Sequence, residues 1–147
     1  MLGMAGILAS CGGTTSSTSS SATGSSESSS TKVDLKADVF IYQYSDTYIG
    51  SVRTALNTDL TAKGITGTFK DAAGVQATQT QQIETAIAAG SKMLIANLVE
   101  QTATGVSVAG KAKTAKIPAI FFNREVPDAA VTSTTYPDNC FVGTDPD

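Results

Sequence analysis

Polar and aromatic side chains suited to binding a neutral ligand follow three short apolar stretches of this sequence. They are Tyr44, Asp46 and Tyr48 after the first stretch, Asn97 and Glu100 after the second, and Asn123, Arg124 and Glu125 after the third. Carboxylates accept hydrogen bonds from hydroxyls, amides both donate and accept them, and aromatic rings pack on apolar C–H faces. This set of residue types is suited to a sugar or a similar polyhydroxy compound.

Catalytic chemistry has few candidate residues in this sequence. There is no His, which removes the commonest general base and metal ligand and excludes a Ser/His/Asp triad. The turn at residues 45–47 has no glycine, so the first strand is followed by neither a dinucleotide-binding loop nor a P-loop. The two cysteines, Cys11 and Cys140, form no CxxC pair, and Cys140 is interpreted as a small buried residue. We therefore expect a protein that is not an enzyme and uses no cofactor.

Strands alternate with helices after residue 35. Short runs rich in Val, Ile and Phe predict strands over 36–44, 65–69, 92–96, 117–122 and 139–142. Apolar residues at helical spacing predict helices over 47–63, 76–89 and 102–115, the first two ended by Gly64 and Gly90. This alternation is typical of a three-layer, Rossmann-like α/β fold with a parallel sheet, in which the order two-one-three-four is the commonest.

The carboxyl ends of parallel strands share one edge of the sheet, where open α/β folds bind ligands. Strands one and four, with strand three between them, would lie about 10 Å apart, which suits a hexose. We expect Asp46, Tyr48, Asn123 and Arg124 to bind the ligand, with Tyr44 and Asn97 as further candidates. Other interpretations stay open: Asp46 caps the first helix, Tyr48 is a packing residue, and Asn97 is a turn or cap residue.

The first 35 residues are expected to be outside the folded domain. Residues 1–11 are apolar and end in Leu8-Ala9-Ser10-Cys11, which resembles a bacterial lipobox and predicts lipidation of Cys11. The alternative is an unstructured apolar start with a free cysteine. Residues 12–35 are rich in Ser and Thr, which predicts a disordered tether. No Lys or Arg precedes the apolar run, so we expect the true signal peptide to start further upstream.

A longer pattern is carried by four segments in order. They are Ile41-Tyr42-Gln43-Tyr44-Ser45-Asp46-Thr47-Tyr48, Asn97-Leu98-Val99-Glu100, the run from Ile117 to Glu125, and Phe141-Val142-Gly143-Thr144-Asp145. Residues 37–147 thereby resemble the type I periplasmic sugar-binding proteins, with the galactose/glucose-binding branch of ABC transporter solute-binding lipoproteins as the nearest. The resemblance implies two Rossmann-like lobes with a sugar held between them.

The resemblance also implies roles and boundaries. Asp46 and Asn123 would hydrogen-bond sugar hydroxyls and Tyr48 would stack on the pyranose, although that branch usually has Phe at Tyr48 and often Lys at Arg124. Residues 36–124 would form the first lobe, and 125–147 the crossover and the start of the second, with its first strand at 141–145. A calcium site, if the protein has one, would lie beyond residue 147.

The expected partners are a monosaccharide, an ABC transporter permease and the membrane through the lipid anchor. The location is then extracytoplasmic, on the outer face of the bacterial cell membrane or in the periplasm. An alternative function is a sugar- or autoinducer-sensing receptor that feeds a chemoreceptor or histidine kinase. A net charge of −3 argues against a nucleic-acid partner. The acidic and proline-containing end at residues 144–147 is typical of a helix start, so we expect a truncated chain.

Overall fold

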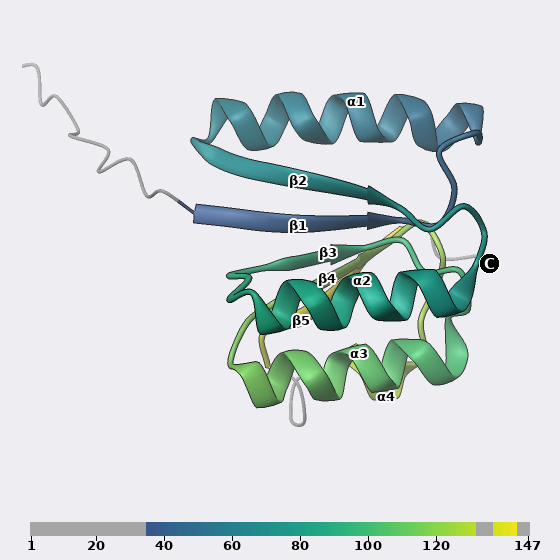
Figure 1. Ribbon diagram of the computed structural model, residues 1–147, viewed down its shortest axis with the longest axis vertical. Helices are drawn as coiled ribbons and strands as arrows, with labels where there is room; N and C mark the ends of the chain where they lie inside the picture. The colour runs from purple at the N-terminus through teal and green to yellow at the C-terminus, as the bar shows by residue number, and fades with distance from the viewer. Residues whose placement is uncertain (1–34, 132–136, 144–147) are drawn as a thin grey trace, which may run out of the picture. The chain divides into compact units, whose positions relative to one another are not determined.

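Parallel strands and helices alternate through the part of the chain that the computed structural model describes, residues 35–131 and 137–143 (Figure 1). The strands are β1 (Leu35–Ile41), β2 (Ile65–Asp71), β3 (Leu94–Ala96), β4 (Ala119–Phe122) and β5 (Asn139–Val142). The helices are α1 (Thr47–Ala62), α2 (Gln76–Ala88), α3 (Thr102–Ala115) and the short α4 (Asp128–Val131). The predicted α/β class is confirmed, and α4 is an element that the sequence pattern did not indicate.

The five strands form one parallel sheet in the order β2-β1-β3-β4-β5. The first four strands have the order that is commonest in such folds, and β5 extends it at the edge. The chain moves one way from β1 to β2 and the other way through β3, β4 and β5. Since βαβ crossovers are right-handed, this reversal places α1 on one face of the sheet and α2, α3 and α4 on the other, as Figure 1 shows.

Each face of the sheet has its own apolar core because successive strand residues point to opposite sides. On the face of α2 and α3, Phe40 and Phe121 are fully buried together with Ile83 and Val108 from the helices. On the face of α1, the strand residues Val39, Ile41, Ile95 and Phe122 pack with Ile49 and Leu60 of the helix. Phe40 between Val39 and Ile41 shows how one apolar run supplies both cores.

The α1 face of the sheet is hollowed beside the helix. Its open groove has a volume of about 590 Å³. One wall of the groove consists of the α1 side chains Val52, Leu56 and Leu60. Its floor consists of residues in or next to the strands, Met93, Ile95, Ile120, Phe122 and Val142. Val142 is 59% exposed there, so apolar surface of this face is open to solvent in the described part of the chain.

Strand β1 is shorter than predicted and ends at Ile41. At the end of β1, the carbonyls of Ile41 and Tyr42 bond to the turn after β2. Ala72 N–H donates to Ile41 O at 2.9 Å, and Gly74 N–H donates to Tyr42 O at 2.7 Å. Residues 42–44 therefore lie in the connection to α1. This lengthens the connection that carries the predicted site residues.

Strand β5 pairs with β4 in the same sheet, and the start of a second lobe with a first strand at 141–145 stays a prediction. Asn139 explains the pairing, because its side chain accepts from Ala119 N at 3.1 Å and donates to Ala130 O at 3.2 Å. These two bonds tie the start of β5 to β4 and α4. The predicted burial of Cys140 is wrong: it pairs in register with Ile120 and is exposed on this edge strand.

The lipobox with Cys11 and nearly all of the predicted tether lie outside the described residues. No helix within the described ranges is both long and apolar enough to cross a membrane.

Candidate functional site

Asp46 begins α1 and uses both carboxylate oxygens. It is the N-cap, with extended backbone at φ −70° and ψ 119°, and its Oδ1 accepts from Ile49 N at 2.9 Å. The hydroxyl of Tyr42 donates to its Oδ2. The Tyr42 hydroxyl, followed by the Ile49 N–H, lowers the pKa of Asp46 below its ordinary value. The cap interpretation is confirmed, and because an ionised carboxylate offers about four acceptor positions, the group can still bind a ligand.

Tyr48 lies in the first turn of α1 with 65% of its surface exposed. The interpretation of Tyr48 as a packing residue is therefore wrong for the described part of the chain. The ring lines one end of the groove beside α1. An exposed aromatic ring two residues after an ionised carboxylate can cover an apolar face of a ligand whose hydroxyls reach the carboxylate.

Asn123 follows β4 and lines the same groove as Tyr48. Its backbone has φ 64°, a left-handed conformation that Asn tolerates better than most residues. Its N–H donates to Val142 O at 3.0 Å, which joins this turn to β5. The side chain is exposed. The structure thus brings the predicted residues Tyr48 and Asn123, which are 75 positions apart in the numbering, to one cavity.

Arg124 connects the ends of three strands. Its Nη1 donates to Leu98 O at 2.9 Å and to Val99 O at 2.8 Å, in the loop after β3. Its guanidinium carbon lies 4.7 Å from the ring centroid of Tyr42, after β1. Arg carries five N–H donors, and these bonds to the described residues use only Nη1, so the other donors can bind a ligand.

Asn97 is fully buried one residue after β3. Its backbone N–H donates to Phe40 O at 2.9 Å, whereas neither side-chain polar atom has a hydrogen-bond partner among the described residues. A buried amide without partners is costly. The interpretation of Asn97 as a cap is wrong, because its side chain makes no bond to the first turn of α3, whereas its place in the loop after β3 agrees with the turn interpretation.

Glu100 lies one residue before Gln101, the N-cap of α3, and its side chain accepts from the first-turn N–H groups of the helix. Its Oε1 accepts from Thr102 N at 2.6 Å and Ala103 N at 3.2 Å, and its Oε2 accepts from Thr104 N at 2.9 Å. These N–H groups, that of Thr104 first, lower the pKa of the Glu100 carboxyl. Glu100 therefore positions the start of the helix.

Gln79 holds the loop after β3 and was missed by sequence reasoning. It is fully buried in α2, where its Nε2 donates to Asn97 O at 2.9 Å and its Oε1 accepts from Val99 N at 2.8 Å. A signal was available: Gln79 lies four residues before Ile83 and so shares the inward stripe of the helix.

Tyr44 faces α1. The guanidinium carbon of Arg53 lies 3.8 Å from its ring centroid, and its backbone N–H donates to Asp71 Oδ1 at 3.1 Å. Burial raises the pKa of the Tyr44 hydroxyl. These contacts fix the connection after β1 against both α1 and β2.

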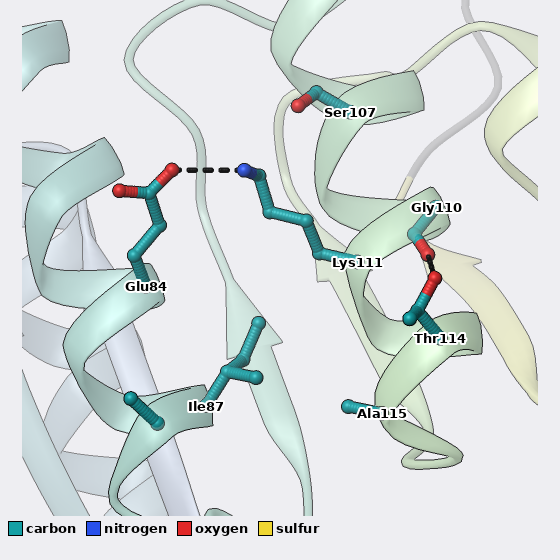
Figure 2. Close-up of a pocket in the computed structure, with 8 residues that line it drawn as sticks. Glu84, Ile87, Ser107, Gly110, Lys111, Thr114 and Ala115 are labelled. Carbon is teal, nitrogen blue, oxygen red and sulfur yellow. Dashed lines mark hydrogen bonds and ion pairs between the residues drawn. The ribbon is translucent and has the colours of Figure 1, made fainter.

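A second groove, of about 610 Å³, lies between α2 and α3. Figure 2 shows Lys111 of α3 reaching Glu84 of α2, an ion pair of 2.8 Å between partly exposed groups. None of the predicted site residues lies among the α2 and α3 side chains that line it. Within the described ranges, no group of three or more His, Cys, Asp or Glu side chains could hold a metal ion.

Comparison with known families decides what kind of domain this is. The family described as periplasmic binding protein domain matches residues 37–147, which is most of the chain. The chain belongs to this family. Members of the family that resemble it include the D-galactose/methyl-galactoside binding periplasmic protein MglB of Haemophilus influenzae, 33% identical over 118 residues. That alignment covers 80% of this chain and 35% of the relative, so the chain spans about a third of the relative's length.

Solved structures of the periplasmic binding protein kind share the fold. A solute-binding protein of an ABC transporter from Actinobacillus succinogenes, with bound D-allose, has a TM-score of 0.66 at 20% identity and is matched over 76% of this chain and 39% of its own. One from Bacillus halodurans, with bound myo-inositol, has a TM-score of 0.64 at 22% identity over 76% and 37%. These similarities show the type I periplasmic binding protein fold, of which this chain has one lobe.

Proposed function

We propose that the protein is an extracytoplasmic solute-binding lipoprotein that captures a monosaccharide and delivers it to an ABC importer. Family membership and the relative named for galactose support this proposal. The observation that carries it is that exposed Tyr48 and the amide of Asn123 after β4 line one groove, while ionised Asp46 begins the helix that carries Tyr48. A glucose- or galactose-like hexose is the ligand that we propose.

Each of these residues has a role that its geometry allows. The ring of Tyr48 packs on the C–H face of the pyranose, since most of its surface is free. The unused lone pairs of Asp46 accept from sugar hydroxyls. Asn123 both donates and accepts at the other side of the groove that it shares with Tyr48.

The other candidate residues are more buried than Tyr48 and Asn123. Arg124 offers the sugar those N–H donors that the Leu98 and Val99 carbonyls do not use. Asn97 is an inner contact, and its unpartnered amide gains hydrogen bonds when the side chains covering it move aside. Tyr44 supports the connection through Arg53.

We further propose that this lobe closes on the sugar together with a second lobe and that the permease recognises the closed state. The sugar stabilises closure because only the closed state contacts it from both sides. Lipidation at Cys11 would keep the protein at the membrane surface.

Calorimetry on the full-length gene product tests the proposal. Titration with glucose, galactose, allose, ribose and myo-inositol is expected to show binding of at least one hexose. Asp46→Asn is the informative variant, because Asn remains a good N-cap while the negative charge is lost. Loss of binding by a variant that still unfolds cooperatively above the assay temperature supports the ligand role.

A matched control is Glu84→Gln, which also removes one carboxylate charge from an exposed residue but lies on α2, on the opposite face of the sheet. It is expected to bind as the wild type does. Absence of heat with every pentose, hexose and inositol would overturn the proposed function. Normal binding by Asp46→Asn would remove Asp46 from the site.

A further inference from the structure

Tyr42 joins three elements at the carboxyl edge of the sheet. It lies just after β1, half-buried against the core of the α1 face. Its hydroxyl donates to Asp46 Oδ2, and its ring lies 4.7 Å from the guanidinium carbon of Arg124. Arg124 is in turn held by the carbonyls of Leu98 and Val99. A continuous set of contacts therefore runs from the loop after β3, through the end of β4, to the carboxylate that begins α1.

We infer that Tyr42 is the positioning residue of the site: it fixes the direction of the Asp46 carboxylate, and Arg124 fixes Tyr42. This inference rests on the proposed function, in which Asp46 binds a sugar hydroxyl. Tyr42 itself acts through Asp46, and its hydroxyl need not touch the sugar.

The carboxylate needs this second contact to have one orientation. The backbone N–H groups of Ile49 and, more weakly, Tyr48 act on the carboxylate from the helix side only. The Tyr42 hydroxyl holds Oδ2, so two points define the plane of the carboxylate and the direction of its remaining lone pairs. Hydrogen bonds are directional, so an acceptor that is oriented before binding loses less entropy when the sugar arrives.

The Tyr42 ring needs a support in its turn. Arg124 lies over the ring, and its guanidinium is restrained because Nη1 donates to the carbonyls of Leu98 and Val99. The ring therefore packs against a fixed group. The charged groups that act on Tyr42 are Asp46, whose hydrogen bond raises the pKa of the hydroxyl, and Arg124, whose positive charge opposes that rise. Arg124 therefore keeps the hydroxyl a good donor to Asp46.

The test compares Tyr42→Phe with the wild type in the full-length protein. The variant keeps the ring under Arg124 and removes only the hydroxyl. We expect sugar affinity to fall about five- to tenfold, the usual effect of one lost hydrogen bond. Sugar affinity is expected to fall at low pH, where Asp46 becomes protonated, and we call this part of the affinity–pH curve the acid limb. In the variant the acid limb should move to higher pH, because the hydroxyl is the largest cause of the lowered Asp46 pKa.

The matched control is Ile83→Val in the core between α2 and the sheet. This change destabilises a protein to a similar extent as a lost hydrogen bond, and it lies on the opposite face of the sheet. Its affinity and acid limb are expected to equal those of the wild type. Equal behaviour of Tyr42→Phe and Ile83→Val would overturn the inference.

Arg124 is tested through Tyr42. Arg124→Met should move the acid limb in the same direction as Tyr42→Phe, and Arg124→Lys, which restores a cation and N–H donors, should reverse part of that shift. In the Tyr42→Phe background, Arg124→Met should move the acid limb no further. A full additional shift in the double variant would show that Arg124 acts independently of Tyr42.

A measurement without sugar separates the two proposals. The pKa of Asp46 can be followed by the carboxyl ¹³C shift in the unliganded protein, and it should be higher in Tyr42→Phe than in the wild type. An unchanged Asp46 pKa overturns the positioning role even if sugar binds. A wild type that binds no sugar overturns the proposed function, whatever the Asp46 pKa shows.

Discussion

The buried side chain of Gln79 gives the sharpest test of how the site is held. Gln79→Met replaces the amide by an apolar group of similar length, so it removes two hydrogen bonds without leaving a large cavity. The carbonyl of Asn97 and the N–H of Val99 then lose these partners. A buried polar group left unpaired costs roughly 1–3 kcal/mol, so we expect the free energy of unfolding to fall by about 3 kcal/mol.

Urea denaturation of the full-length protein measures this loss, from the change in midpoint at an unchanged m value. Hydrogen exchange adds a local measurement: protection of the Val99 amide should fall about a hundredfold, because 1.4 kcal/mol corresponds to a factor of ten. Gln81→Met is the matched control, the same substitution on the exposed side of α2. It is expected to change stability by less than about 0.5 kcal/mol.

The reasoning fails if the two variants unfold at the same urea concentration, or if Val99 keeps its protection in Gln79→Met. Either result would mean that the loop after β3 is held by its other contacts, such as the bonds from Arg124 to Leu98 and Val99. If stability falls but the Val99 amide stays protected, the lost free energy of unfolding comes from weaker packing of α2.

Three further predictions concern Asp46, the core and the edge strand. The fold lowers the pKa of Asp46, so its ionised form stabilises the protein fully at pH values above the ordinary Asp pKa. This contribution is lost as the pH falls through the lowered pKa. Asp46→Asn should therefore flatten that part of a curve of stability against pH. Phe121→Ala should destabilise by about 3–5 kcal/mol in urea denaturation, whereas Val106→Ala, at a 37% exposed position, should cost below about 1 kcal/mol. Cys140 is exposed, so in the 147-residue chain a maleimide should label it without denaturant; labelling only in urea would contradict its placement.

The alternation of strands and helices could be predicted because it depends on local patterns. Apolar runs such as the one around Val39 are too short for a helix and are bounded by turn residues. Asp46 stood where a helix begins, and the structure confirms it as the cap. The sequence did not determine the strand order, although right-handed crossovers leave few arrangements of these units.

Several contacts of the site could not be predicted because they join residues far apart in the sequence. Arg124 bonds to a carbonyl 26 residues earlier, and Gln79 to one 18 residues later. Both depend on which strands are neighbours and on the height at which each strand ends. The same holds for β5: its place beside β4 depends on the side chain of Asn139, which reads in the sequence as an ordinary turn residue.

The sequence by itself determined the class of fold, the Asp46 cap that begins α1 and the types of side chain that reach the carboxyl edge of the sheet. Those features follow from the hydrophobic period and from hydrogen bonds within a few residues. Only the tertiary structure decided which of these side chains are open to a ligand and which are held by other parts of the protein. It leaves Tyr48 and Asn123 open to the groove, and it ties Tyr42, Arg124 and Gln79 into the framework. The physical reason is that a polar group's role depends on whether its partners are already supplied by other strands or remain to be supplied by a ligand.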